Sequence, residues 1–434
     1  MAILIKGGDL VDLKKGKVLP RDILVEDDQI IRIVPWGESG ISGASVEIID
    51  ASGMMVFPGL IDMHVHLREP GQEHKEEIST GAQAAVAGGF TALACMPNTD
   101  PVNDSGEVTG FILERAWEAG LARVFPIAAV TKGQKGQSLS DFGELRSAGA
   151  VGISDDGFPV RDSGMMRLAM ERAKEHGLVI ISHCEDRSLS AGGVMHEGEI
   201  SRRLGFKGIP AESEEIMVFR EICLARLTKC PVHIAHVSTA GSVALIKRAK
   251  EEGLPVTAET APHYFSLDHR AVEKMGSMAK MNPPLRRPED VEAIKVGLSE
   301  DIIDVIATDH APHSDLEKNV EFERAAFGII GLETALPLVL ALVREGVLSL
   351  QAAVYKLSRR PAELLGVEGG LLEEGKRADL TIVDPECEYV LTAADIQSKS
   401  KNTPFLNNLF KGRAILTMIG GRIVWRQETK NPDR

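Results

Sequence analysis

Cysteine is scarce in this chain, and the few cysteines show no spacing that would join them. Cys95, Cys184, Cys223, Cys230 and Cys387 are odd in number, and no two of them form a Cys-x-x-Cys motif. A disulfide framework needs an even set of paired cysteines, so none is expected here. The sequence instead predicts reduced thiols in the core of a cytoplasmic protein.

Long apolar runs and an excess of basic residues are also missing. No uninterrupted apolar segment is long enough to cross a bilayer, and the stretch from Met1 to Asp9 is interrupted too early for a signal peptide. With 49 basic and 63 acidic residues, the net charge of −14 argues against nucleic acid or an anionic membrane as the main partner. A local cationic pocket could still receive an acidic small molecule.

The middle of the chain alternates short apolar runs with amphipathic stretches at helical spacing. Eight predicted strands cover residues 60–66, 90–96, 123–130, 150–156, 178–184, 231–238, 255–260 and 302–309. Predicted helices between them cover residues 76–87, 107–119, 165–176, 214–229, 242–252 and 289–299. This alternation predicts an α/β fold, a parallel (β/α)8 barrel of the TIM type.

The two ends of the chain have a different pattern. Residues 1–57, 379–391 and 413–425 contain short alternating runs separated by Gly and Asp turns. Two antiparallel pieces of this size would be marginal alone, so we expect them to pair into one small β-sandwich beside the barrel. The predicted domains are 1–57 (N-terminal part of the sandwich), 58–370 (barrel) and 371–434 (C-terminal part).

Metal-binding side chains cluster at the predicted strand ends, where the active residues of such barrels lie. The first strand ends with His64, His66 and Arg68, and alternation along a strand puts the two histidines on one face, with Asp62 in line. Two imidazoles at that spacing can hold one transition-metal ion. Later strand ends add further candidates, namely Asp155, Asp156, His183, His236 and Asp309.

Each of these residues alone has an ordinary structural explanation. A buried histidine is most often a hydrogen-bonded core residue, and Asp155 and Asp156 beside Gly157 would commonly form a turn or a helix cap. Arg68 could serve only as a surface ion-pair partner. Independent structural needs would not place all of them at successive strand ends, so together they favour a hydrolytic metal centre.

Several motifs resemble those of a known family over essentially the whole chain. The specific ones are residues 62–68 (DMHVHLR) and 307–318 (ATDHAPHSDLEK), supported by Met96-Pro97-Asn98-Thr99 and by residues 281–286 and 377–380. In these the chain resembles the type I dihydroorotases of the amidohydrolase superfamily. The resemblance implies two zinc ions, one bound by His64, His66 and Asp309, the other by His183 and His236, with Asp156 between them.

The segment after the fourth predicted strand distinguishes branches of this superfamily. Many members bridge their metals there with a carbamylated lysine, but residues 150–156 (AVGISDD) contain none. This matches the dihydroorotase branch that uses an aspartate, and it counts against hydantoinases and dihydropyrimidinases. The sequence alone does not decide between Asp155 and Asp156.

The resemblance also implies a reaction and a substrate site. The reaction would be the reversible cyclisation of N-carbamoyl-L-aspartate to L-dihydroorotate in de novo pyrimidine (UMP) biosynthesis. Asp309 would act as base and then acid. A guanidinium can hold a carboxylate through two parallel hydrogen bonds, so Arg68 is the expected clamp. The other implied substrate-binding residues are His66, Asn98, Asn282, His313, Phe327 and Gly328.

Other readings stay open at this point. Allantoinase or another cyclic amidohydrolase would share much of the site, and a non-catalytic barrel scaffold would have lost metal ligands. A homo-oligomer is possible, and association with an aspartate transcarbamoylase occurs in some relatives; nothing in the sequence demonstrates either. Residues 158–163 and 314–331 are long enough to form lids. For His263 and His310 we expect supporting roles.

Overall fold

The computed structural model describes residues 2–40 and 46–427. Residues 1, 41–45 and 428–434, all from the predicted sandwich segments, lie outside the described part. Among the described residues, no helix is long and apolar enough to cross a membrane.

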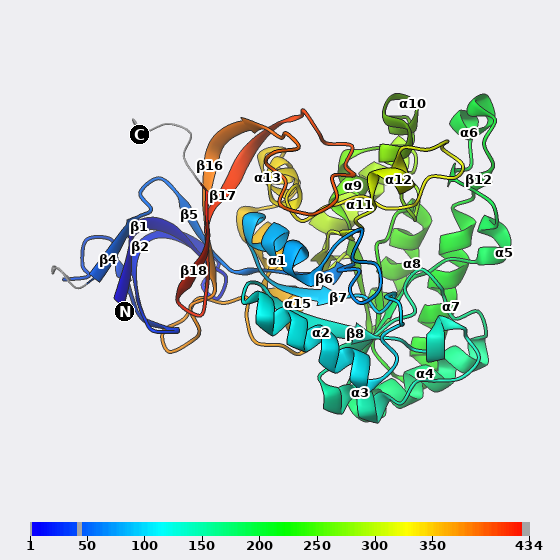
Figure 1. The fold of residues 1–434 in the computed structure, drawn as a ribbon, viewed down its shortest axis with the longest axis horizontal. Coiled ribbons are helices and arrows are strands. Elements are labelled where there is room, and N and C mark those ends of the chain that lie inside the picture. Colours follow the sequence, from blue (N-terminus) through cyan, green and yellow to red (C-terminus); the bar gives the residue numbers. More distant parts are fainter. Residues whose placement is uncertain (1, 41–45, 428–434) are drawn as a thin grey trace.

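Eight parallel strands form the barrel (Figure 1). They are β6 (Leu60–Val65), β7 (Phe90–Cys95), β8 (Arg123–Ala128), β9 (Gly152–Ile153), β10 (Val179–Ser182), β13 (Val232–Ile234), β14 (Val256–Thr260) and β15 (Val305–Ile306). Each pairs with the next in chain order. A bridge between Val65 and His310 joins the two edges of the sheet, and the His66 N–H donates to the His310 carbonyl at 2.8 Å. The predicted (β/α)8 barrel is confirmed.

All six predicted helices form. They are α1 (Ile78–Ala87), α2 (Gly106–Ala119), α4 (Ser163–His176), α7 (Glu212–Thr228), α8 (Ala240–Glu251) and α11 (Pro288–Ser299). Three begin at side chains that accept a hydrogen bond from the exposed N–H groups of the first turn: Ser105 caps α2, Asp162 caps α4 and Thr239 caps α8.

Shorter elements fill the connections. The helices are α3 (Phe142–Ala148), α5 (Arg187–Ser190), α6 (Glu199–Leu204), α9 (Pro262–Ser266), α10 (Ala271–Met275) and α12 (Asp315–Lys318), with 3-10 turns at Lys132–Gln134 and Gly276–Ala279. Strands β11 (Met195–His196) and β12 (Gly208–Ile209) pair with each other. After the last barrel strand come α13 (Ala335–Arg344), α14 (Leu350–Leu357) and α15 (Arg359–Leu365), for which the sequence pattern gave no prediction.

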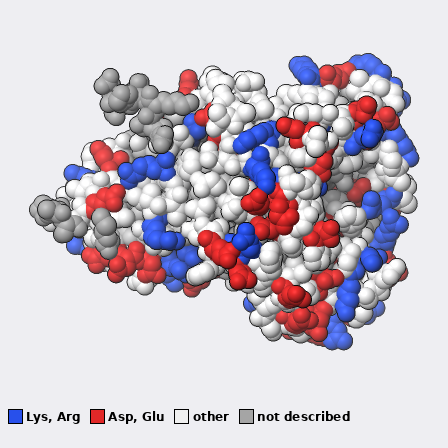
Figure 2. All heavy atoms as spheres, viewed as in Figure 1, with Lys and Arg blue, Asp and Glu red and all other residues white. Residues whose placement is uncertain are grey.

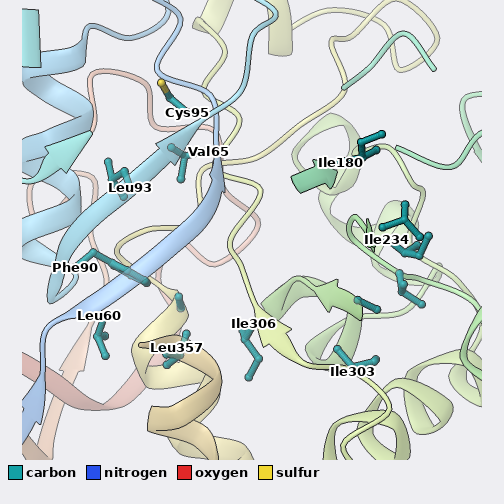
Figure 3. Packing of buried hydrophobic residues seen from close by; sticks show 14 of the residues in the cluster. Leu60, Val65, Phe90, Leu93, Cys95, Ile180, Ile234, Ile303, Ile306 and Leu357 are labelled. Atoms are coloured by element: carbon teal, nitrogen blue, oxygen red, sulfur yellow. The ribbon is translucent and has the colours of Figure 1, made fainter. Parts of the chain in front are cut away.

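Alternation along the barrel strands creates two apolar layers. Residues such as Leu93, Ile180 and Ile234 face the surrounding helices (Figure 3). Their neighbours Ala94 and Ile181 belong to a separate buried cluster inside the barrel. Because every strand is covered on both faces, the sequence of each reads as a nearly continuous apolar run.

Both chain ends contribute to one further sheet. Its strands are β1 (Ala2–Asp12), β2 (Lys17–Glu26), β3 (Gln29–Pro35), β4 (Val46–Asp50), β5 (Met55–Pro58), β16 (Leu380–Val390), β17 (Leu409–Ile419) and β18 (Arg422–Arg426). The antiparallel pair β5–β16 joins the two ends, as expected. The N-terminal piece is not purely antiparallel, since β1 pairs in parallel with both β4 and β5.

The segment between β16 and β17 leaves this sheet and contacts the barrel. The Lys399 N–H donates to Glu76 at 3.0 Å, and the Asn402 side chain donates to the Ala311 carbonyl at 3.1 Å. A C-terminal segment therefore lies beside the strand ends that carry the candidate site. The face in Figure 2 carries acidic and basic side chains intermixed.

Candidate metal centre and substrate pocket

A cavity of about 610 Å³ lies at the C-terminal ends of the barrel strands. The predicted site residues that line it are His66, Arg68, Asn98, Asp156, His183, His236, Asn282, Asp309, His313, Phe327 and Gly328. His64 lies beneath its floor and is fully buried. The fold therefore brings the predicted site residues to one place.

Asp156 lies at the centre of the candidate metal ligands. Its Oδ1 is 3.5 Å from His64 Nε2, 3.3 Å from His183 Nδ1 and 3.5 Å from His236 Nε2. Its Oδ2 is 3.5 Å from His66 Nε2. The structure thus contains two groups that could each hold a metal ion, and both include this carboxylate.

Asp309 completes the cluster beside His66. Its Oδ1 lies 3.1 Å from His66 Nε2 and 3.7 Å from His64 Nε2. Burial by itself would raise the pKa of Asp309, but the hydrogen bond to His66 and the nearby histidines hold it below its ordinary value. The carboxylate is therefore ionised at neutral pH.

The neighbouring Asp155 has a different environment. Its carboxylate accepts hydrogen bonds from the Thr131 N–H at 3.1 Å and the Thr131 hydroxyl at 2.5 Å. Burial raises the pKa of Asp155 to about 6. Asp155 thus fixes the loop after β8, whereas Asp156 faces the histidines, and the geometry separates two residues that the sequence could not.

Three buried atoms of the cluster have no hydrogen-bond partner within the described part of the chain. His64 Nε2 and Asp156 Oδ1 are two of them and face each other, and His236 Nδ1 is a third. Burying a polar group without a partner is costly, so native proteins rarely do it. A bound cation would satisfy the two facing atoms, and imidazole and carboxylate are donors that zinc accepts. The residues present fit a metal centre.

Backbone strain gathers at the same place. Arg68, His236 and Asp309 adopt φ values of 63°, 34° and 49°, a region that residues other than glycine rarely occupy. Such conformations persist only where the surroundings enforce them, and they are typical of functional sites. Strand β6 ends at Val65, so His66 and Arg68 lie beyond the strand, and alternation along the strand does not determine where their side chains point. Asp62 accepts from the Thr308 N–H instead of entering the pocket.

Arg68 is a buried cation without an anionic partner. It is 7% exposed, and its Nε donates to the Pro312 carbonyl at 3.1 Å. Among the described residues it forms no ion pair within 4 Å, and its charged form is favoured only by the more distant carboxylates of Asp309, Glu317, Asp156 and Glu76. Burial lowers the pKa of Arg68 to about 10, so the guanidinium stays charged at neutral pH.

His313 and Asn98 flank this guanidinium and the cluster. His313 Nε2 is 2.8 Å from the Phe327 carbonyl oxygen, which can only accept, so this nitrogen carries the proton. Arg68 Nη2, at 3.2 Å from the same nitrogen, keeps its own protons for another acceptor. Asn98 Oδ1 lies 2.8 Å from His66 Nδ1, which leaves His66 Nε2 toward the cluster.

Two carboxylates that the sequence reasoning missed support the histidines. Glu259 lies 2.5 Å from His64 Nδ1 and 3.2 Å from His233 Nε2, so it turns His64 Nε2 toward the cluster. Glu185 contacts His183 Nε2 and the Asn282 amide, each at 3.1 Å. Both residues lie at the end of a predicted strand or directly after it. An acidic residue at such a position was the feature of the sequence that could have identified them.

His263 and His310 lie outside the cluster. His310 Nε2 is 3.4 Å from Glu76, and its Nδ1 accepts from the Gly331 N–H at 3.1 Å. Burial lowers the pKa of His263 to about 4. Cys184 is buried behind the site, with its thiol 3.7 Å from the Ser182 hydroxyl.

Comparison with known families agrees with this geometry. Residues 53–242 match a family described as dihydro-orotase-like, and residues 211–425 match one described as the amidohydrolase family. The barrel, its strand-end histidines and aspartates, and these matches define an amidohydrolase, an enzyme that acts on cyclic amides with the help of metal ions.

The most similar sequences narrow this class. The chain is 52% identical over 425 residues to a dihydroorotase of Pelotomaculum thermopropionicum, covering 98% of each chain. It is 50% identical over 426 residues to a dihydroorotase of Geobacter sp. strain M21, covering 98% of this chain and all of the relative. This chain belongs to the dihydroorotase family.

Solved structures show the same architecture in other amidohydrolases. An L-hydantoinase (dihydropyrimidinase) from Arthrobacter aurescens superposes with a TM-score of 0.86 at 27% identity, covering 98% of this chain and 96% of its own. A D-hydantoinase (dihydropyrimidinase) from Thermus sp. gives 0.81 at 25% identity, covering 98% and 95%. The barrel and terminal sheet are thus shared, while sequence identity favours the dihydroorotases.

Proposed function

We propose that this chain interconverts N-carbamoyl-L-aspartate and L-dihydroorotate in de novo pyrimidine biosynthesis, using two zinc ions per subunit. The observation that carries the substrate is the buried, unpaired Arg68 at the edge of the candidate metal cluster. A buried guanidinium that no carboxylate contacts directly is costly to maintain, and an anionic substrate would supply that contact.

Six side chains would hold the metal ions. His64, His66 and Asp309 would bind one, His183 and His236 the other, and Asp156 would contact both, as its central position supports. Bound there, the ions would supply a more acidic water and polarisation of the ring carbonyl. Glu259 would keep His64 in the tautomer that presents Nε2.

Asp309 would move the proton. In the hydrolytic direction its carboxylate accepts a proton from the attacking water and delivers it to the departing ring nitrogen. Its lowered pKa keeps it ionised before the reaction. In the direction of cyclisation the same group works in reverse.

The pocket around Arg68 would recognise the substrate. The guanidinium would hold the free carboxylate, with Asn98 and His313 beside it. Asn282 and the backbone of Phe327 and Gly328, which also line the pocket, would contact the ring.

The direct test is hydrolysis of L-dihydroorotate by the purified protein, together with its zinc content. We expect turnover that is lost on chelation and restored by zinc, with about two equivalents bound. A protein that opens allantoin in preference would contradict the substrate assignment, which the Arg68 pocket and the absence of lysine after β9 favour. A protein that binds no metal and shows no turnover would be a non-catalytic scaffold. The presence of all six candidate metal ligands argues against that outcome.

The cellular location and the oligomeric state of the protein form a further part of the proposal. We place the reaction in the cytoplasm, because all five cysteines are free thiols. Self-association, and association with an aspartate transcarbamoylase, are tested by measuring the mass of the purified protein alone and mixed with that enzyme.

A further inference from the structure

Two buried lysines lie beneath the Phe327 wall of the pocket. Lys318 is fully buried and Lys280 is 2% exposed. Within the described part of the chain, neither ammonium has a carboxylate within 4 Å. Burial, and then the neighbouring Lys280, lower the pKa of Lys318 to about 7. Keeping two ammonium groups here costs free energy, so their contacts must offset that cost.

The contacts are almost all to backbone carbonyls of one segment. Lys318 Nζ donates to the carbonyls of Ala326 and Gly328, each at 2.9 Å, and to that of Lys280 at 3.1 Å. Lys280 Nζ donates to the carbonyls of Phe322 at 2.7 Å and Glu323 at 3.0 Å.

Residues 319–328 form no helix or strand of their own. The Glu321 carbonyl accepts from N–H groups within the segment, but the carbonyls of Phe322, Glu323, Ala326 and Gly328 accept from side chains outside it or at its edge. The two lysines supply these, and the Lys280 ammonium also lies 4.4 Å from the centre of the Phe327 ring. They determine the path of the segment that forms this pocket wall.

Asn402, in the segment between β16 and β17, also binds the pocket-wall segment. It is 1% exposed, and its Nδ2 donates to the carbonyls of Ala311 and Gly328, each at 3.1 Å. Its Oδ1 accepts from the His313 N–H at 3.1 Å, and its own carbonyl accepts from the Ile330 N–H at 3.0 Å. The Asn402 side chain thus connects Ala311 and His313, which follow β15, to Gly328 of the pocket wall.

A short chain of contacts connects these groups to the guanidinium. The Gly328 carbonyl accepts from both Lys318 and Asn402. The adjacent Phe327 carbonyl accepts from His313 Nε2, which lies 3.2 Å from Arg68 Nη2. A Cβ atom at Gly328 would meet the Ala311 Cβ at 2.7 Å, so the turn has little room to move.

We propose that Lys318 and Asn402 are positioning residues for substrate recognition: they hold the Phe327–Gly328 turn beside His313 and Arg68, and so set the affinity for the substrate carboxylate. This inference rests on the proposed function. Neither residue touches the metal ligands, so their loss affects substrate binding more than the chemical step.

The test compares Lys318→Met with Lys356→Met as a matched control. Lys356 is also a buried lysine bound to a carbonyl, that of Ile303 at 2.7 Å; it additionally pairs with Asp301 at 2.7 Å and does not line the pocket. We expect Lys318→Met to raise KM for L-dihydroorotate about tenfold or more, with kcat within about threefold of the unaltered enzyme. Zinc content should not change. Lys356→Met should lower the melting temperature without altering KM.

Equal effects of the two substitutions on KM, or a fall in kcat at unchanged KM, would overturn the positioning role. If Lys318→Met does not fold, Asn402→Ala decides by the same measurements. Failure of the unaltered protein to hydrolyse L-dihydroorotate would remove both proposals. Normal turnover with an unchanged KM in the variant would remove this inference alone.

Discussion

Replacing Arg68 with Met separates substrate binding from stability. The substitution keeps an unbranched apolar side chain and removes a buried charge that has no carboxylate within 4 Å in the described structure. Only one hydrogen bond to the protein backbone is lost, from Nε to the Pro312 carbonyl at 3.1 Å. That loss costs about 1 kcal/mol, and relief of the unpaired buried charge offsets it, so the free energy of unfolding should stay within about 1 kcal/mol of wild type.

Substrate affinity should fall sharply in the same variant. A guanidinium that holds a carboxylate with two charge-assisted hydrogen bonds, each worth roughly 1.5–3 kcal/mol, contributes about 3–4 kcal/mol after losses elsewhere. At about 1.4 kcal/mol per factor of ten, KM should rise roughly 10²–10³-fold.

The assay measures L-dihydroorotate hydrolysis over a wide substrate range, with zinc content and urea unfolding on the same samples. Arg123→Met is a suitable control, because Arg123 pairs with Asp379 through two contacts, at 3.1 and 3.2 Å, away from the pocket. That variant should keep a normal KM. A KM within about threefold of wild type in Arg68→Met would refute the clamp.

Three further outcomes are expected. Asp309→Ala should abolish turnover, and a near-native rate would remove this residue from proton transfer. Asp156→Asn should lose metal, whereas Asp155→Asn should retain it, because only the first faces the histidines; equal zinc contents would contradict the assignment. Burial raises the pKa of Glu333 to about 7, so between about pH 4.5 and pH 7 the folded state holds a proton that the unfolded chain releases. The free energy of unfolding therefore falls as the pH rises through this range. The free energy of unfolding of Glu333→Gln, measured with urea, should therefore rise relative to that of wild type as the pH increases from about 5 to 8. A difference between the two proteins that does not change with pH would contradict this reasoning.

Much of the architecture follows from local patterns that the sequence displays directly. The barrel was predictable because each strand is buried on both faces and each helix has one apolar face, so the two periods differ clearly. Strands of only two residues, β9 and β15, were predicted too long, because apolar residues continue past the hydrogen-bonded part of the sheet.

Some features of the site depend on contacts between distant residues. The choice of Asp156 over Asp155 depends on Thr131, which captures one of two adjacent carboxylates. The support of His64 by Glu259 crosses from β6 to β14, and no local spacing connects them. The parallel pairing of β1 with β4 and β5 is likewise a choice among partners that alternation alone leaves open.

The sequence by itself therefore determined the barrel, the joining of both chain ends and the chemical kind of the site, because these depend on periodicity and on residue types at strand ends. Tertiary structure alone decided which carboxylate faces the histidines, that Arg68 is left without an ionic partner, and that Asn402 reaches the pocket from the C-terminal segment. These outcomes depend on which groups meet in a crowded interior, where each buried charge or carbonyl takes the nearest suitable partner whatever its distance along the chain.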